Sequence, residues 1–147
     1  MLRFVKVRPV KDPARGTELS AGIDFFIPNN FEPKRVYNNE SILIPSGIKV
    51  KVPAGYVLIA FNKSGIASKK CLLVGACVVD EDYQGEIHIN LMNVGTESQV
   101  LNPGDKIVQF VLLPVNYAGL EEATSLEDLY PTTTERGEGA FGSTGLK

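Results

Sequence analysis

The sequence predicts an all-β fold of barrel or jelly-roll type that ends in a flexible, glycine-rich arm, and three observations lead to this prediction. Apolar stretches are short and are repeatedly interrupted by glycine, proline or asparagine. Apolar and polar residues alternate clearly at positions 86–92. After Pro131 the composition becomes polar and glycine-rich, with too few large apolar side chains to build a core.

The length fits one domain, because 147 residues with 44% apolar content can form a single core. We place this domain at residues 1–130 and the arm at residues 131–147. Six segments are expected to be strands: 3–7, 41–44, 48–52, 56–61, 86–92 and 106–115. In the fifth segment Ile87, Ile89 and Leu91 share one face, which predicts a half-buried strand.

Turns and helices complete the expected domain. The segments PAG at 53–55 and NPGD at 102–105 are typical of tight turns between consecutive strands. Helix is expected only as a turn or two at residues 64–70 and in the acidic stretch 120–129.

Charge and cysteine content exclude several classes of function. A net charge of −2 gives no overall basic field, so polymeric nucleic acid is not an expected partner. The first residues lack the apolar run of a signal peptide, and no 18-residue apolar stretch exists, so we expect no membrane association and a cytoplasmic location, or the host-cell cytoplasm for a viral source. Cys71, Cys77 and His88 do not form a zinc motif, so we expect reduced cysteines and no metal held directly by the protein.

Two glycine-containing segments are candidate phosphate sites. In the arm, Arg136 supplies a fixed positive charge, the following glycines expose backbone N–H groups, and Ser143 and Thr144 add hydroxyls. A flexible tail explains the same residues equally well, although Phe141 has nothing local to pack against and is expected to dock elsewhere. The other segment is NKSGIA, which starts at Asn62.

Lys63, Ser64 and Gly65 offer an ammonium, a hydroxyl and an exposed amide at an expected helix start, which suits an anion. A solvated turn with Ser64 as N-cap is the simpler interpretation of these residues alone.

A third candidate is a group of carboxylates, Asp80, Glu81 and Asp82, that precedes a turn. Such carboxylates usually face solvent. An aspartate beside bound water can nevertheless act as a general base.

The order of these segments resembles the trimeric dUTPase family. Five spaced motifs have counterparts over nearly the whole chain: AGIDFF from Ala21, NKSGIA from Asn62, GACVVDEDYQG from Gly75, PGDKIVQ from Pro103 and RGEGAFGSTG from Arg136. The resemblance implies a distorted jelly-roll, or β-clip, chain that forms a homotrimer. It also implies three active sites at subunit interfaces, each covered by the arm of another chain.

The implied reaction is hydrolysis of dUTP to dUMP and pyrophosphate by water attack at the α-phosphorus, which limits uracil in DNA and supplies dUMP for thymidylate synthesis. The resemblance assigns Asp80 to the deoxyribose 3′-hydroxyl and the attacking water. Tyr83 lies under the sugar and excludes a 2′-hydroxyl by contact. Backbone groups of residues 75–79, among them Gly75, Cys77 and Val79, recognise uracil.

The remaining implied roles concern the triphosphate and the metal. Phosphate contacts fall to Lys63, Ser64, Gly65 and Gln109, and in the arm to Arg136, Gly142, Ser143 and Thr144, while Phe141 stacks on uracil. Mg²⁺ is expected to be bound through the triphosphate and water. Asp24 is expected near the outer water molecules of the metal ion, in a supporting role.

Three departures from the family pattern are present. Lys63 stands where the family usually has arginine and lacks the planar fork that suits phosphate. Cys77 and Ala140 stand where glycine is common. We expect weaker phosphate binding from the first, and strain from the last only if residue 140 adopts a positive φ.

Two alternatives remain open. A dCTP deaminase, possibly bifunctional, shares this fold, but the DEDYQG turn and the complete arm favour the hydrolase. A nucleotide-sensing trimer that contacts a regulatory protein is the other, with acidic residues 120–129 as a possible surface, although a solvated face explains that stretch more simply.

Overall fold

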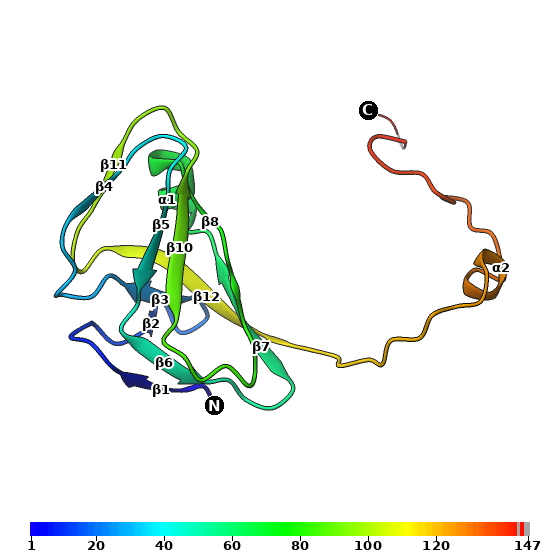
Figure 1. Cartoon of the computed structure of the whole chain (residues 1–147), viewed down its shortest axis with the longest axis horizontal. Helices are drawn as coiled ribbons and strands as arrows, with labels where there is room; N and C mark the ends of the chain where they lie inside the picture. The colour runs from blue at the N-terminus through cyan, green and yellow to red at the C-terminus, as the bar shows by residue number, and fades with distance from the viewer. Residues whose placement is uncertain (144, 146–147) are drawn as a thin grey trace. The chain divides into compact units, whose positions relative to one another are not determined.

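The computed structural model describes residues 1–143 and 145, and the chain divides into two units, Met1–Asn116 and Tyr117–Lys147. The described part of the first unit is built almost entirely of strands, as the sequence predicts (Figure 1). Its elements are β1 (Arg3–Lys6), β2 (Ala14–Arg15), β3 (Ile23–Phe26), β4 (Lys34–Val36), β5 (Ser41–Pro45), β6 (Ile48–Lys51), β7 (Tyr56–Phe61), α1 (Ser64–Lys70), β8 (Leu72–Val74), β9 (Val78–Val79), β10 (His88–Asn93), β11 (Gln99–Leu101) and β12 (Lys106–Pro114).

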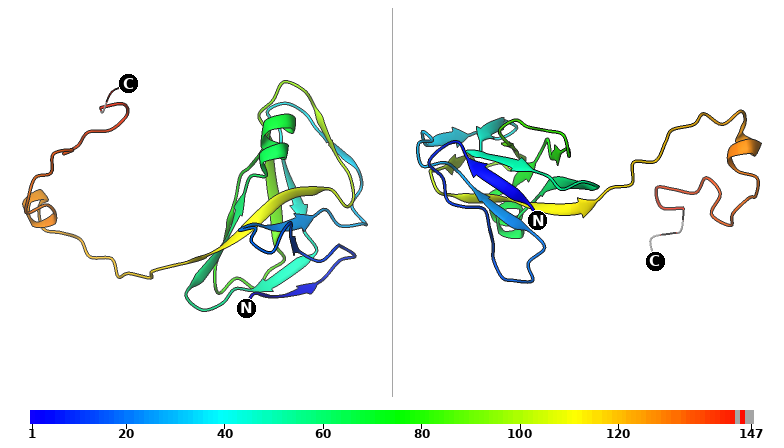
Figure 2. Two further views of the ribbon diagram at one scale, coloured as in Figure 1. Left: turned by 180° about the vertical axis from the view of Figure 1, so that it is seen from behind. Right: turned by 90° about the horizontal axis from the view of Figure 1, so that it is seen from below.

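Sheet pairing joins strands that are distant in sequence, which confirms the all-β, jelly-roll-like fold. The largest sheet has the order β2-β3-β12-β7-β9, with β12 between β3 and β7 (Figure 2). A second sheet has the order β5-β10-β8, and two further pairs are β1-β6 and β4-β11. All of these pairings are antiparallel.

The core lies between these sheets and follows the predicted alternation. Ile87, Ile89 and Leu91 are all buried, so the inward face of β10 is the one that the sequence indicates. The rings of Phe25 on β3 and Phe110 on β12 lie 4.4 Å apart at their centroids. Fully burying a side chain of this size contributes about 1.5–3 kcal/mol, so a continuous apolar core stabilises the unit.

A β-bulge interrupts the alternation of β12 just before Gln109. The pairing with β3 shifts register between Lys106 and Val108, and the consecutive residues Ile107 and Val108 are both buried. An extra residue in one strand changes which face the following side chains occupy. Gln109 is consequently half-buried rather than part of the core.

Both predicted turns are present, with glycine in the left-handed region where a side chain would be strained. Gly55 has φ of 77° between β6 and β7, and Gly104 has φ of 79° between β11 and β12. The Tyr56 amide donates to the Pro53 carbonyl, which closes the first turn.

The helix at residues 64–70 is present, but its start differs from one of the two interpretations of the sequence. Lys63 is the N-cap residue and makes no side-chain capping bond, whereas Ser64 is the first helical residue. The interpretation of Ser64 as an N-cap is therefore wrong. None of the helices in the described part of the chain is long and apolar enough to cross a membrane.

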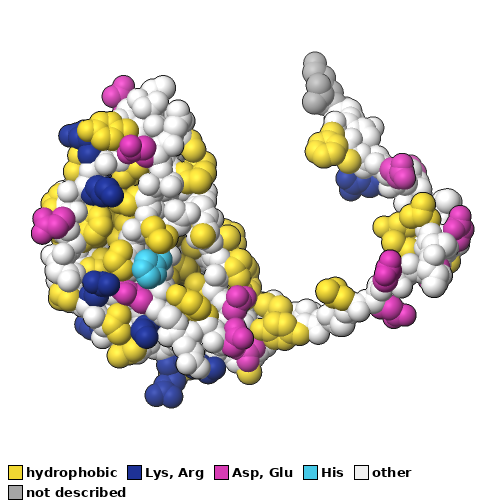
Figure 3. Space-filling model, viewed as in Figure 1, with side chains coloured by type: hydrophobic (Ala, Val, Ile, Leu, Met, Phe, Trp, Pro, Cys, Tyr) yellow, Lys and Arg dark blue, Asp and Glu magenta, His cyan; other side chains and the backbone are white. Residues whose placement is uncertain are grey.

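The second unit contains one short helix, α2 (Leu126–Leu129), capped by the Ser125 hydroxyl, which accepts from the Asp128 amide. This helix is shorter than the predicted stretch 120–129. None of the described residues of this unit is buried, and acidic and hydrophobic side chains lie along it (Figure 3). The predicted arm boundary at residue 130 and the flexibility of the arm stay predictions.

Several candidate residues lie in this second unit. The Arg136 guanidinium donates from Nε to the Gly139 carbonyl at 2.9 Å, which bends the chain locally. Phe141 is fully exposed, and its φ of 49° lies in the left-handed region, whereas Ala140 does not adopt a positive φ. The strain considered for Ala140 is therefore absent. Thr144 lies outside the described residues.

Candidate functional site

Within the first unit the predicted site residues form two groups, one at the carboxyl end of β7 and one that runs along β7 to its other end. The first group contains Asp24 on β3, Gln109 on β12, and Lys63 to Gly65 at the start of α1. The pairing of β12 places Gln109 opposite both Asp24 on β3 and Phe61 on β7. Because β12 lies between those strands, Gln109 is at the centre of this group.

A buried carboxylate organises the charges of the first group. Asp24 is only 5% exposed, and its two oxygens bind two ammonium groups: Lys63 Nζ at 2.5 Å and Lys106 Nζ at 3.3 Å. A buried carboxylate is tolerated when it is paired in this way. The three side chains together keep one positive charge, and both lysines stay partly exposed.

Gln109 is fixed by a contact that the sequence did not indicate. Its Nε2 donates to the Asn62 carbonyl at 2.8 Å, next to Lys63. A Cβ atom placed at Gly22 would lie 2.0 Å from Gln109 Oε1, so glycine at position 22 leaves the space that the glutamine occupies. Gly65 is different, because a Cβ atom placed there would have no neighbouring atom within 4 Å. A ligand can therefore approach the Gly65 backbone closely.

The second group begins at residues 75–79, which run beside β7. The Ala60 amide donates to the Cys77 carbonyl, and Val79 is paired with Leu58. Cys77 packs its side chain against the core and Val79 is buried, so both residues present only backbone to a ligand. The Cys77 side chain, which stands where the family commonly has glycine, is therefore turned toward the core.

The three carboxylates that follow alternate in exposure. Asp80 and Asp82 are exposed, whereas Glu81 is half-buried and its Oε2 accepts from the Gly55 amide at 2.8 Å. The Tyr83 amide donates to the Asp80 carbonyl at 3.2 Å, which closes a tight turn between the two residues. Asp80 and Tyr83 are thus brought to one side of a short loop.

Tyr83 is hydrogen-bonded to Glu86, and Glu86 is held by an ion pair with Arg8. The Tyr83 hydroxyl donates to the Glu86 carbonyl at 2.9 Å. The Glu86 carboxylate accepts from Arg8 Nε at 2.7 Å and from the Gly47 amide at 2.8 Å. Hydrogen bonds from the Arg8 side chain hold the pKa of Glu86 below its usual range against the opposing effect of burial, and the same pair raises the pKa of Arg8.

Asp80 and Lys63 lie toward opposite ends of β7 within one chain, whereas residues 74–77 lie beside Ala60 and Asn62. Val79 is opposite Leu58 and Asp80 follows it, whereas Lys63 comes five residues after Leu58 at the other end of β7. At about 3.3 Å per residue in a strand, this separation is roughly 16 Å. Sequence motifs cannot reveal such a separation, because they give order along the chain and not position in space.

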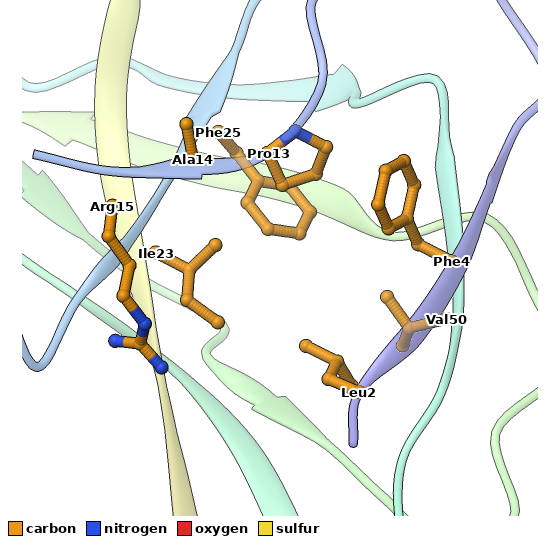
Figure 4. A pocket seen from close by; sticks show the side chains of 8 residues that line it. All are labelled: Leu2, Phe4, Pro13, Ala14, Arg15, Ile23, Phe25 and Val50. Carbon is orange, nitrogen blue, oxygen red and sulfur yellow. The ribbon is translucent and has the colours of Figure 1, made fainter. Parts of the chain in front are cut away.

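A third region is an apolar pocket that does not contain predicted site residues. It lies between β1 and β3 and is lined by Leu2, Phe4, Pro13, Ala14, Arg15, Ile23, Phe25 and Val50 (Figure 4). Its one charged residue, Arg15, donates to the carbonyls of Ser20 and Ala21. The pocket therefore lacks converging polar groups for a phosphate or a base.

The chemistry available in the two groups is that of phosphate binding and proton transfer. Among the described residues, no three His, Cys, Asp or Glu side chains gather in a metal-binding cluster, and both cysteines are free thiols. The first group supplies positive charge and donors, and the second supplies an exposed carboxylate beside an aromatic ring.

Comparisons with known proteins give a consistent result. The family profile described as dUTPase matches residues 8–145. The "Deoxyuridine 5'-triphosphate nucleotidohydrolase" of Maricaulis maris is 39% identical over 97% of this chain and 97% of its own length, and that of Mus musculus is 37% identical over 98% and 85%. A Staphylococcus bacteriophage 80alpha dUTPase G164S mutant, solved with dUpNHpp, has the same fold, with a TM-score of 0.83, 24% identity and 99% coverage of both chains.

Proposed function

The chain belongs to the dUTPase family and hydrolyses dUTP to dUMP, and we propose that it does so at sites shared between the subunits of a homotrimer. The observation that supports the proposal is that Asp80 and Lys63 lie toward opposite ends of β7 within one chain. A nucleotide that contacts Asp80 of one chain would reach the first group, which includes Lys63, of another chain. The family relationship makes the deaminase alternative the less favoured one.

Asp80 is proposed as the catalytic base. Its carboxylate is exposed at the start of the turn, where it can accept a hydrogen bond from the 3′-hydroxyl of the deoxyribose and orient a water molecule. The water oxygen attacks the α-phosphorus and loses a proton to the carboxylate. The bond from the α-phosphorus to the bridging oxygen breaks, and pyrophosphate leaves with the bond electrons.

Tyr83 is proposed to select the sugar. Its ring is held at one edge by the bond from its hydroxyl to the Glu86 carbonyl, and 43% of the residue is exposed. A ring fixed under a deoxyribose leaves no room for a 2′-hydroxyl. Ribonucleotides would therefore be rejected by steric contact.

The first group is proposed to bind the phosphates. Lys63 and Lys106 carry charge that Asp24 only partly neutralises, Ser64 offers a hydroxyl, and Gly65 offers an accessible amide. Donors aimed at the leaving pyrophosphate stabilise the charge that develops on it. Gln109 already donates to Asn62, so its Oε1 would accept from a water molecule and its second N–H would reach a phosphate.

The arm is proposed to complete the site. Arg136 would pair with the γ-phosphate, Phe141 would stack on uracil, and Gly142, Ser143 and Thr144 would donate to phosphate oxygens. The full exposure of Phe141 in its own unit supports a docking role, because an aromatic ring normally finds a packing partner. A docked arm would exclude bulk water from the reaction.

Magnesium is proposed to enter with the triphosphate. Both oxygens of Asp24 bind lysine ammonium groups, which suits a supporting residue rather than a direct metal ligand. The ion would neutralise phosphate charge through phosphate oxygens and water. A solved dUTPase of phage phi11, described with a structural Mg(II) ion, shares the fold of this chain, with a TM-score of 0.76 and 23% identity.

Pyrophosphate release from dUTP, dCTP, dTTP and UTP in the presence of Mg²⁺ tests the activity. Release from dUTP alone is the expected result. Binding of dUTP without release would instead favour the nucleotide-sensing alternative.

Mixed subunits test the shared site. Asp80→Asn and Ser64→Ala chains are each impaired alone, but a mixed trimer would contain some sites with both residues intact. Random mixing of equal amounts restores about one quarter of the wild-type sites if each site uses two chains. Failure to recover activity in refolded mixtures would mean that each chain carries its own complete site.

A further inference from the structure

Asn90 on β10 occupies the space that a side chain at Gly75 would need. A Cβ atom built at Gly75 would lie 2.0 Å from Asn90 Oδ1 and 2.9 Å from its Cγ. Gly75 does not adopt a positive φ, so its backbone conformation does not require glycine. The fit against Asn90 is the reason that the structure gives for glycine at this position.

Asn90 ties residues 75–76 to β10 and is itself tied to β5. Its Oδ1 accepts from the Ala76 amide at 2.8 Å, and its Nδ2 donates to the Ile42 carbonyl of β5 at 3.1 Å. The backbone carbonyl of Asn90 accepts from the Gly75 amide at 3.0 Å. Two of these hydrogen bonds set the direction of the peptide groups of this segment, and the third anchors the Asn90 side chain on β5.

These bonds also decide which backbone groups remain available to a ligand. The amides of Gly75 and Ala76 are both used by Asn90, and the Cys77 carbonyl is used by Ala60. In the described part of the chain, the Cys77 amide and the Gly75 and Ala76 carbonyls make no hydrogen bond to another protein group. One donor and two acceptors are thus left in a segment that Asn90 holds in place.

The same close fit between a glycine and one polar side chain occurs twice more. A Cβ at Gly22 would lie 2.0 Å from Gln109, and a Cβ at Gly85 would lie 2.2 Å from the Tyr83 hydroxyl. Among the glycines of the first unit, only these three would place a Cβ within 2.5 Å of another atom. Gln109 and Tyr83 are both proposed substrate contacts, and Asn90 is the third side chain that fills the space beside a glycine.

We propose that Asn90 is a positioning residue for the base, and that it sets the preference for uracil over cytosine by orienting the backbone groups of residues 75–77. The proposal rests on the function proposed above for this segment. Uracil presents O4 as an acceptor and N3 as a donor, whereas cytosine reverses both. A fixed backbone pattern that satisfies one base leaves polar groups unpaired with the other, and such mismatches discriminate strongly.

The test compares kcat and KM for dUTP and dCTP in Asn90→Ala, with Met92→Ala as the matched control. Met92 lies two residues further along β10 and is partly exposed, without a role in the site. Asn90→Ala is expected to raise KM for dUTP and to lower the ratio of kcat/KM for dUTP over dCTP, each by about tenfold, since it removes two hydrogen bonds. Met92→Ala is expected to leave the ratio unchanged.

Two further variants separate positioning from general loss of structure. Asn90→Asp keeps the acceptor for the Ala76 amide and should retain more of the dUTP preference than Asn90→Ala. Gly75→Ala should lower the preference because its methyl group meets Asn90, whereas Gly75→Ala combined with Asn90→Ala should be no worse than Asn90→Ala alone.

An unchanged preference in a folded Asn90→Ala enzyme, or fully additive effects in the double variant, would overturn the proposal. Wild-type protein run in parallel separates this result from failure of the proposed function. If the wild type releases no pyrophosphate from dUTP, the function fails and the inference fails with it.

Discussion

Asp24 Oδ1 and Lys63 Nζ lie 2.5 Å apart, and they join a strand of the five-stranded sheet to the start of α1. The carboxylate is buried, and Lys106 occupies its other oxygen. The pair therefore connects the stability of the fold to the placement of positive charge at one end of β7.

Asp24→Ala should lower the free energy of unfolding and raise KM for dUTP. The change leaves two lysines without their shared acceptor, and losing a charged hydrogen bond of this kind costs about 1.5–3 kcal/mol. Chemical denaturation measures the first effect and steady-state kinetics the second. Asp12→Ala is the control, because Asp12 pairs with Lys6 on the surface and its loss should have little effect. Equal stability of the Asp24→Ala and Asp12→Ala proteins would contradict the assigned role.

Asp80→Asn should slow hydrolysis while dUTP remains bound. The amide nearly preserves the shape of the carboxylate but cannot accept the proton, and general-base catalysis typically contributes about 10²–10⁴-fold. Asp82→Asn is the matched control, because Asp82 is also exposed and lies two residues away. Turnover and dUTP binding are measured for both variants. Comparable losses of turnover in the two would remove the distinction on which the assignment depends.

Gly85→Ala should weaken the preference for dUTP over UTP. The added methyl group would lie 2.2 Å from the Tyr83 hydroxyl, so the ring must move away from its position. Tyr83→Phe keeps the ring and loses only the bond to the Glu86 carbonyl, so it should keep most of the preference. The ratio of kcat/KM for the two nucleotides is the readout, and a preserved ratio in Gly85→Ala would argue against steric selection by Tyr83.

Removal of residues 136–147 should abolish most activity without changing the thermal stability of the first unit. The buried apolar core of the described chain consists of residues between Val10 and Phe110, all within the first unit, so the core remains whole without the arm. Calorimetry and pyrophosphate release are measured on the same sample. A fully active truncated enzyme would show that the arm has no part in the reaction.

Glu86 should contribute to a loss of stability in acid. Its pKa is lowered in the folded protein, mainly by hydrogen bonds from Arg8, so its stabilising effect is complete above the ordinary value of 4.5 and is lost as pH falls through the folded pKa. Glu86→Gln cannot titrate and should show a shallower decline of stability over this acid range. Urea unfolding at a series of pH values measures the difference, and parallel declines in the two proteins would count against the linkage.

The fold was predictable where the pattern is local. Strand β7 and helix α1 have the bounds that the sequence indicates, because apolar runs and turn residues mark their ends. Strands β2, β4 and β11 were not predicted, since each is only two or three residues long and is stabilised by pairing with a distant partner. The bulge in β12 was not predicted either, because it depends on the register of the pairing with β3.

The site was predictable only in part. Motif resemblance identified residues in both groups, but Asn62 and Asn90 were missed. Each acts through bonds to backbone groups that are distant in sequence, such as Asn62 Oδ1 with the Val74 amide and Asn90 Oδ1 with the Ala76 amide. No local spacing signals such contacts. The separation of Asp80 from Lys63 along β7 likewise depends on the pairing of β9 with β7.

The close fits of Gly22 with Gln109, Gly75 with Asn90 and Gly85 with Tyr83 have a consequence for how this sequence can diverge. A larger residue can be accepted at one of these glycines only after the facing side chain has shortened or turned away. Each pair must therefore change in a fixed order, with the polar partner first. Descendants of this chain are expected to keep each of these glycines for as long as they keep its polar partner.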